Sequence, residues 1–193
     1  MCVDVSGSMS YPVTGFRRGQ TSVTRCVDVA ALMAAAILRQ NSRAMVLPFD
    51  TEVRDVNLNA RDTVMTNSGK LAALCGGGTA CSVAIDRIAV SRHPVDLVVL
   101  ISDNQSWFDA TPGHRGTATM QAWERVKKLN RQARLVCLDI APYTTTQAHE
   151  RLDILNVGGF SDAVFDIIGT FARGELSAAH WVSEINKVRL DAE

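Results

Sequence analysis

The sequence has no excess of charge of either sign, because its 193 residues carry 20 lysines and arginines against 20 aspartates and glutamates. A balanced chain produces no global electrostatic field that would draw it to nucleic acid or to a membrane surface. Binding to nucleic acid would therefore need a local basic patch or a further part of the protein.

Long apolar runs and a cysteine framework are also missing. The longest apolar block, Val29 to Leu38, is too short for a helix that spans a membrane, and no signal peptide is predicted because the N-terminus runs directly into a strand pattern. The cysteines are odd in number and form no CxxC pair, which argues against a disulfide framework and a zinc site; they are Cys2, Cys26, Cys75, Cys81 and Cys137. We expect a cytoplasmic protein in a reducing compartment. Cys75 and Cys81 flank a run of glycines, and their thiols are either redox-reactive or small buried fillers.

The sequence does contain a regular alternation of strand and helix patterns. Val95 to Ile101 is nearly continuous apolar sequence, typical of a strand covered on both faces. The alternation predicts an α/β fold, with a doubly wound, mainly parallel central sheet and helices on both faces. The polar stretch Glu52 to Asn57 is predicted to add one antiparallel edge strand. We expect one domain over residues 1–174, followed by a C-terminal helix within 175–193 that packs on this domain or on a region outside the sequence.

Oxygen-bearing side chains gather where predicted strands end. Asp4, Ser6 and Ser8 are spaced two apart, so in an extended segment they would lean to one side. Thr79 follows three glycines, and Asp103 ends the buried strand at 95–101. Ligands in such folds bind outside the carboxyl ends of the strands, and Mg²⁺ prefers oxygen ligands in near-octahedral geometry. The sequence therefore predicts a Mg²⁺ site, or a Mn²⁺ site, built from these five residues. The alternative is that Asp4 caps a turn and the serines satisfy loop backbone.

The three pieces DVSGS, GGGT and ISD resemble, in this order, the metal-ion-dependent adhesion site (MIDAS) of von Willebrand factor A domains. Four flanking stretches resemble more closely the von Willebrand A-like domain at the C-terminal end of Ro autoantigen (TROVE) proteins, of the bacterial or phage type. They are PFDTEV at 48–53, GGTACS at 77–82, ISDNQSW at 101–107 and ILNVGGFSDAVFDII at 154–168. Because only two residues precede Asp4 in its strand, we expect this chain to be a fragment that lacks the N-terminal helical repeats of such proteins.

The resemblance implies a function and roles for the site residues. The hydroxyls of Ser6, Ser8 and Thr79 would bind the metal, Asp4 and Asp103 would bind it directly or through water, and an acidic side chain of a protein partner would take the vacant position. The whole protein would be a ribonucleoprotein component that binds small non-coding RNA or takes part in RNA quality control, mainly through the absent repeats.

Loop residues near the predicted site offer a possible rim for a partner. Trp107 and Phe108 either anchor a partner or tuck against the domain. The basic residues Arg17, Arg18 and Arg115 either contact RNA phosphate or a partner's acids, or are solvated loop charges.

Two other functions compete with a non-enzymatic binding module. Two acids at neighbouring strand ends also occur in magnesium-dependent phosphohydrolases, although position 6 is serine and no lysine is placed near the loops. The same fold would also suit a von Willebrand A domain that partners an AAA-type ATPase. The sequence does not name the protein partner or the oligomeric state, and it does not show whether this domain itself touches RNA.

Overall fold

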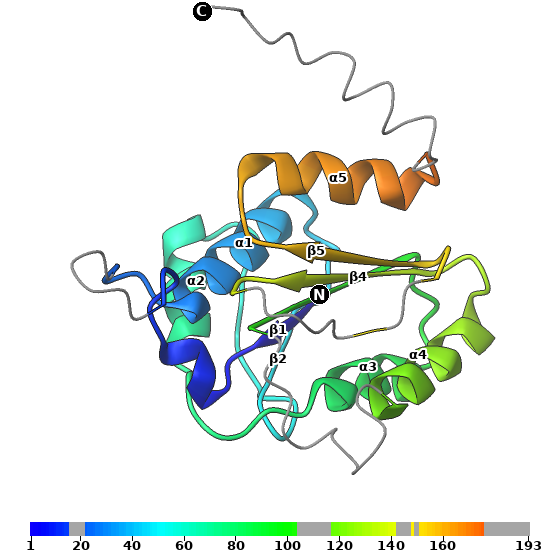
Figure 1. Cartoon of the computed structure of the whole chain (residues 1–193), viewed down its shortest axis with the longest axis horizontal. Coiled ribbons are helices and arrows are strands. Elements are labelled where there is room, and N and C mark those ends of the chain that lie inside the picture. The colour runs from blue at the N-terminus through cyan, green and yellow to red at the C-terminus, as the bar shows by residue number, and fades with distance from the viewer. Residues whose placement is uncertain (16–21, 104–116, 142–147, 149–150, 176–193) are drawn as a thin grey trace, which may run out of the picture. The chain divides into compact units, whose positions relative to one another are not determined.

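The computed structural model describes residues 1–15, 22–103, 117–141, 148 and 151–175. The described part contains five strands: β1 (Cys2–Asp4), β2 (Leu47–Phe49), β3 (Leu97–Ser102), β4 (Arg134–Asp139) and β5 (Ile154–Gly158). Its helices are the short 3-10 helix η1 (Gly7–Ser10) and five α-helices: α1 (Cys26–Gln40), α2 (Val64–Ala72), α3 (Cys81–Ser91), α4 (Thr117–Leu129) and α5 (Asp162–Arg173). Figure 1 shows their course.

All five strands run parallel, in the order β2-β1-β3-β4-β5. The chain leaves β1 toward β2 on one side and later returns to place β3 on the other side, so the strand order reverses at β1. Since parallel strands all end at the same edge, Asp50, Asp4, Asp103 and Asp139 lie at the carboxyl ends of four neighbouring strands. This is the edge where ligands bind in open α/β sheets.

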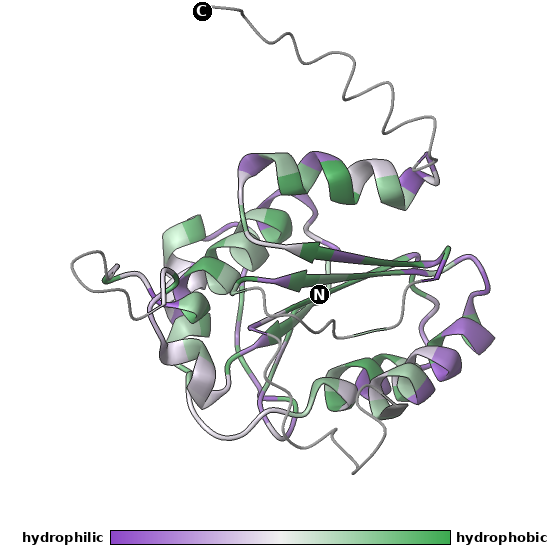
Figure 2. Cartoon of the chain, in the orientation of Figure 1, coloured by the Kyte–Doolittle hydropathy of each residue, from purple (hydrophilic) through white to green (hydrophobic). Residues whose placement is uncertain are grey.

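The core is built from alternate strand residues and the apolar faces of the helices. One cluster joins strand residues such as Leu100 and Leu135 to Ile85 of α3 and Trp123 of α4. Residues such as Val3 and Ile101 point to the other face by the alternation of strand side chains, and α1 contacts both β1 and β3. Figure 2 shows the strands as largely hydrophobic. The predicted α/β fold is confirmed, as an all-parallel sheet.

The predicted antiparallel edge strand at 52–57 is wrong. After Asp50 the chain turns back and forms a single antiparallel bridge between Phe49 and Val53. The Arg54 N–H donates to the Pro48 carbonyl at 2.8 Å, but Pro48 has no N–H to donate in return, so the ladder stops there. The edge strand is β2 itself, where proline is tolerated.

The chain divides into two compact units, Met1–Phe160 and Ser161–Glu193. Helix α5 belongs to the second unit. Ser161 occupies its N-cap position, but the Ser161 side chain makes no capping hydrogen bond. The predicted boundary at residue 174 stays a prediction, and the final helix predicted beyond it lies in residues that the structure does not describe. Among the described helices, none has the length and apolar character needed to cross a membrane. All five cysteines are free thiols in the structure.

Candidate metal centre

The loop after β1 brings the hydroxyls of Ser6 and Ser8 together. The strand ends at Asp4, Ser6 is still extended, and the chain then tightens into η1 from Gly7. The two Oγ atoms lie 3.2 Å apart, and the Ser6 N–H donates to Asp4 Oδ1 at 2.8 Å. The meeting of these side chains therefore depends on a turn, and not on continuous extended backbone as the spacing suggested.

The carboxylate of Asp4 is fully buried at the centre of this edge. Its Oδ2 accepts a hydrogen bond from the Ser102 hydroxyl at 2.6 Å, across the β1–β3 pair. Burial raises the pKa of Asp4 to about 7; the neighbouring Asp103 also raises it, while the hydrogen bonds from Ser102 and Ser6 lower it. Asp103, also buried, thus lies near enough to Asp4 to repel its charge.

The glycine loop is tied to the serine loop by backbone hydrogen bonds. The Gly7 N–H donates to the Gly77 carbonyl at 2.9 Å, and the Gly76 N–H donates to the Val5 carbonyl at 2.8 Å. An added Cβ at Gly7 would lie 3.0 Å from the Gly77 oxygen, so this close approach favours glycine. Thr79, two residues further on, is buried with 1% of its surface exposed.

Two residues at this edge were not identified from the sequence. Ser102 anchors Asp4, and Asp50, at the end of β2, packs against Gly77 while its carbonyl accepts the Ala80 N–H at 2.8 Å. The signal for Asp50 was present, because an acid directly after an apolar strand is the feature that identified Asp103. No comparable signal marks Ser102, since its role depends on the register between β1 and β3.

Two thiols border the same edge. Cys75 Sγ donates to the Ser6 carbonyl at 3.3 Å. Burial raises the pKa of Cys75, and it raises the pKa of Cys26 to about 11, with a further contribution from Asp103 and Asp4. A raised pKa disfavours the reactive thiolate, which favours the role of a filler for both side chains.

The structure therefore brings Asp4, Ser6 and Ser8 together, places Asp103 near Asp4, and ties the glycine loop that precedes Thr79 to the serine loop. The donor set is two carboxylates and three hydroxyls, all hard oxygen ligands. In the described part of the chain, no cluster of three or more His, Cys, Asp or Glu side chains has the arrangement of a metal site. The predicted rim residues Arg17, Arg18, Trp107, Phe108 and Arg115 lie outside the described residues.

Comparisons with known proteins agree with this architecture. The family model "Ro60 vWA domain" matches residues 1–172. The RNA-binding protein RO60 of Deinococcus radiodurans is 30% identical over 177 residues, which are 91% of this chain and 32% of that protein. The crystal structure of the Deinococcus radiodurans Ro (RSR) protein is similar with a TM-score of 0.69 and 25% identity, over 91% of this chain and 34% of that one.

The chain thus spans about a third of the length of both relatives. The family match covers most of the chain, including all five strands and both loops of the candidate site. This chain therefore belongs to the family of Ro60 von Willebrand A domains.

Proposed function

We propose that this chain is a divalent-metal-dependent binding module of a Ro-like RNA-binding protein. Asp4, Ser6, Ser8, Thr79 and Asp103 would hold Mg²⁺ or Mn²⁺, directly or through water. The acidic side chain of a protein partner would complete the coordination shell. The observation that carries the proposal is the meeting of the Ser6 and Ser8 hydroxyls beside the buried Asp4, with Asp103 near enough to affect its pKa.

The spacing of the serine hydroxyls supports this assignment. Mg²⁺ holds its oxygen ligands at 2.0–2.1 Å, so two adjacent ligands of an octahedron lie about 2.9 Å apart. The Oγ atoms of Ser6 and Ser8 are 3.2 Å apart, close to that value. The same two hydroxyls share a hydrogen bond, and an ion bound between them would replace that contact.

The charges at the site also support a cation. Asp4 is buried beside Asp103, and no ion pair between described residues includes Asp4. A divalent ion would balance the charge of these two carboxylates, which would otherwise repel each other in a buried setting. Serine and threonine hydroxyls add ligands without adding charge, which keeps the ion electrophilic.

The role in the whole protein follows from family membership. The relative in Deinococcus radiodurans is named as an RNA-binding protein, and we infer that the full-length protein that contains this domain binds small non-coding RNA. We assign no catalytic reaction to the domain, because the described site offers no lysine beside its carboxylates to hold a phosphate. The five free thiols support a reducing, cytoplasmic setting.

A thermal unfolding experiment on this chain tests the metal site. At a Mg²⁺ concentration 100 times its Kd, binding stabilises the native state by about 2.7 kcal/mol, which corresponds to a Tm increase of about 5–10 °C for a chain of this size. Asp4→Asn and Ser8→Ala should abolish or strongly reduce the increment.

Ser10→Ala is the matched control, because Ser10 lies two residues beyond Ser8 and its hydroxyl donates to the Gly7 carbonyl at 2.7 Å. It should keep the full increment. No increment with Mg²⁺ or Mn²⁺ in the unaltered chain would refute the proposal. Metal-dependent turnover of a generic phosphate ester that is lost in Asp4→Asn would instead favour the phosphohydrolase.

A further inference from the structure

At the edge of the sheet opposite the metal site, basic side chains outnumber acidic ones. Residues 86–96, 124–134 and 151–153 form this surface, which we call the basic edge. Hydrogen bonds join the three segments: Asn130 Nδ2 donates to the Val95 carbonyl at 3.0 Å, and Lys127 pairs with Asp153 at 3.2 Å. Together they hold four acidic and eight basic side chains, a net charge of +4 in a chain whose total is zero.

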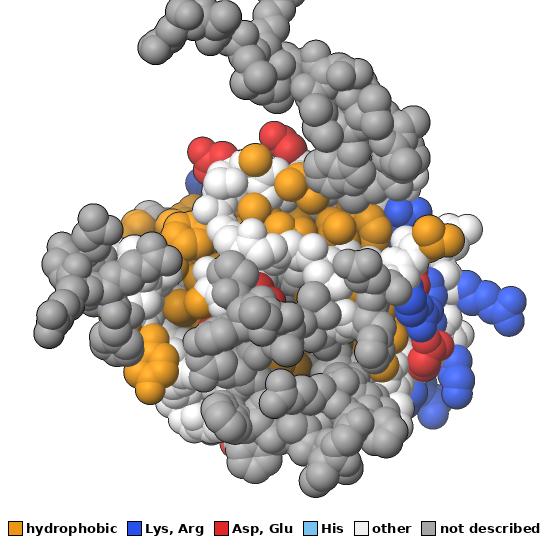
Figure 3. All heavy atoms as spheres, viewed as in Figure 1, with side chains coloured by type: hydrophobic (Ala, Val, Ile, Leu, Met, Phe, Trp, Pro, Cys, Tyr) orange, Lys and Arg blue, Asp and Glu red, His pale blue; other side chains and the backbone are white. Residues whose placement is uncertain are grey.

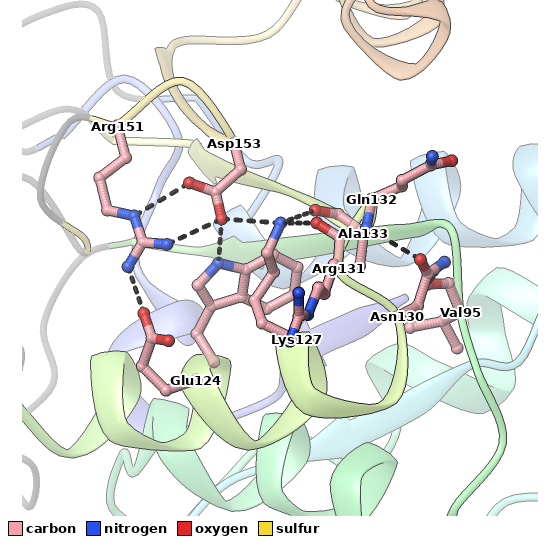
Figure 4. Close-up of polar contacts among 10 residues, drawn as sticks. Val95, Glu124, Lys127, Asn130, Arg131, Gln132, Ala133, Arg151 and Asp153 are labelled. Carbon is pink, nitrogen blue, oxygen red and sulfur yellow. Dashed lines mark hydrogen bonds and ion pairs between the residues drawn. The ribbon is translucent and has the colours of Figure 1, made fainter.

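The acidic side chains of the basic edge already have partners. Asp86 pairs with Arg125, and Glu124 pairs with Arg151. Asp96 accepts a hydrogen bond from Asn130 at 3.0 Å. Figure 4 shows Asp153 at the centre of the network, where it accepts from the indole of the buried Trp123 at 3.0 Å and from Arg151 and Lys127. Three of the four carboxylates are thus in ion pairs, and Asp96 is hydrogen-bonded to the neutral Asn130 amide.

Several basic side chains, in contrast, are exposed and form no ion pair with any described residue. They are Arg87, Arg92, Lys128 and Arg131. Figure 3 shows Lys and Arg side chains gathered on the right-hand side of the molecule in that view. The excess positive charge is therefore open to solvent and not neutralised locally.

These side chains are not needed to stabilise the end of α4. Lys127 already does so, because its ammonium donates to the Arg131 and Ala133 carbonyls beyond the helix. The following turn is fixed by Asn130 Oδ1, which accepts the Gln132 N–H at 2.9 Å. The backbone that carries Lys128 and Arg131 is thus already ordered by hydrogen bonds, which lowers the conformational entropy lost when these side chains bind a ligand.

We propose that the basic edge binds the phosphodiester backbone of RNA. Guanidinium groups match phosphate oxygens in pairs, and the four uncommitted cations lie on two neighbouring helix ends and the loops that follow them. The choice of RNA over an acidic protein rests on the family membership behind the proposed function, whereas the surface itself rests on the charges described here.

Fluorescence anisotropy with a labelled short single-stranded RNA and the full chain tests this proposal. The measurement is made in EDTA, so it does not depend on the metal site. With three or four phosphates contacted, a rise in salt from about 50 to 200 mM should weaken binding by about 20-fold to 50-fold. Lys128→Glu combined with Arg131→Glu should weaken binding by about 10-fold or more at low salt.

The matched control reverses the same amount of charge elsewhere. Arg43→Glu combined with Arg61→Glu alters two exposed arginines next to α1 and α2, and it should weaken RNA binding by less than about 3-fold. Lys128→Gln combined with Arg131→Gln repeats the test with a milder change, and circular dichroism verifies that each variant is folded.

Three outcomes would overturn the proposal: no RNA binding at low salt, equal losses in the two variant pairs, or equally tight binding of poly-L-glutamate, which would indicate an acidic protein as the partner. The Mg²⁺-induced Tm increase is measured in the same variants. If that increase is absent but RNA binds as expected, only the proposed metal function fails; the reverse result leaves the metal site intact and refutes the basic edge.

Discussion

Replacing Gly77 by alanine should destabilise the domain, whereas the same change at the adjacent Gly76 should not. Gly77 has a φ of +76°, in the left-handed region that favours glycine, and an added Cβ would lie 2.9 Å from Asp50 Oδ2. At Gly76 an added Cβ meets nothing within 4 Å, and the residue is not among the glycines with positive φ. The two positions therefore differ in both backbone strain and contact.

The expected magnitude follows from these two terms. A left-handed backbone costs a non-glycine residue about 1–2 kcal/mol. The contact with Asp50 adds about 1–2 kcal/mol of overpacking, because this side chain is held in place by the Glu52 N–H at 3.0 Å and by Arg54 at 3.7 Å. Gly77→Ala should thus lower the free energy of unfolding by about 2–4 kcal/mol. Gly76→Ala should leave it unchanged or raise it by about 0.4–1 kcal/mol, through the lower entropy of the unfolded chain.

Urea denaturation of both variants in EDTA measures this difference without a contribution from bound metal. A coincident loss of fluorescence and circular dichroism would justify a two-state treatment. A Gly77→Ala variant within about 0.5 kcal/mol of Gly76→Ala would show that the contact between Asp50 and the glycine loop is not tight in solution, and the reasoning would fail.

The remaining predictions concern pH and helix capping. The pKa of Asp4 is about 7 in the native state and 3.8 in the unfolded state, so between these values the native state binds a proton that the unfolded state does not. In EDTA, lowering the pH from about 8 to 5.5 should therefore stabilise the unaltered chain by about 2 kcal/mol relative to Asp4→Asn. Urea midpoints measured across this range would contradict the assignment if the two proteins changed in parallel. Thr63→Ala should cost about 1 kcal/mol, because the Thr63 hydroxyl accepts the Thr66 N–H at 3.0 Å at the start of α2, while Ser161→Ala should cost much less because its side chain makes no such bond. Thermal unfolding measures the stability of both variants, and equal losses would count against the cap at Thr63.

Much of the fold could be predicted from local patterns. The continuous apolar run at 95–101 predicted a central strand, and β3 is indeed buried with neighbours on both sides. The polar stretch at 52–57 gave the wrong result, because strand propensity is weak there and the missing N–H of Pro48 ends the pairing after one bridge. Local pattern does not show which neighbour a strand will find.

The sequence by itself determined the alternation of strands and helices and the chemical types that end the strands, because periodicity and residue chemistry are local properties. It also carried the three motifs and flanking stretches by which the family was identified. Only the tertiary structure decided which of these groups meet. The hydrogen bond of Ser102 to Asp4, the packing of Asp50 under Gly77 and the assembly of the basic edge all depend on strand order and register, which arise when segments distant in sequence pack together.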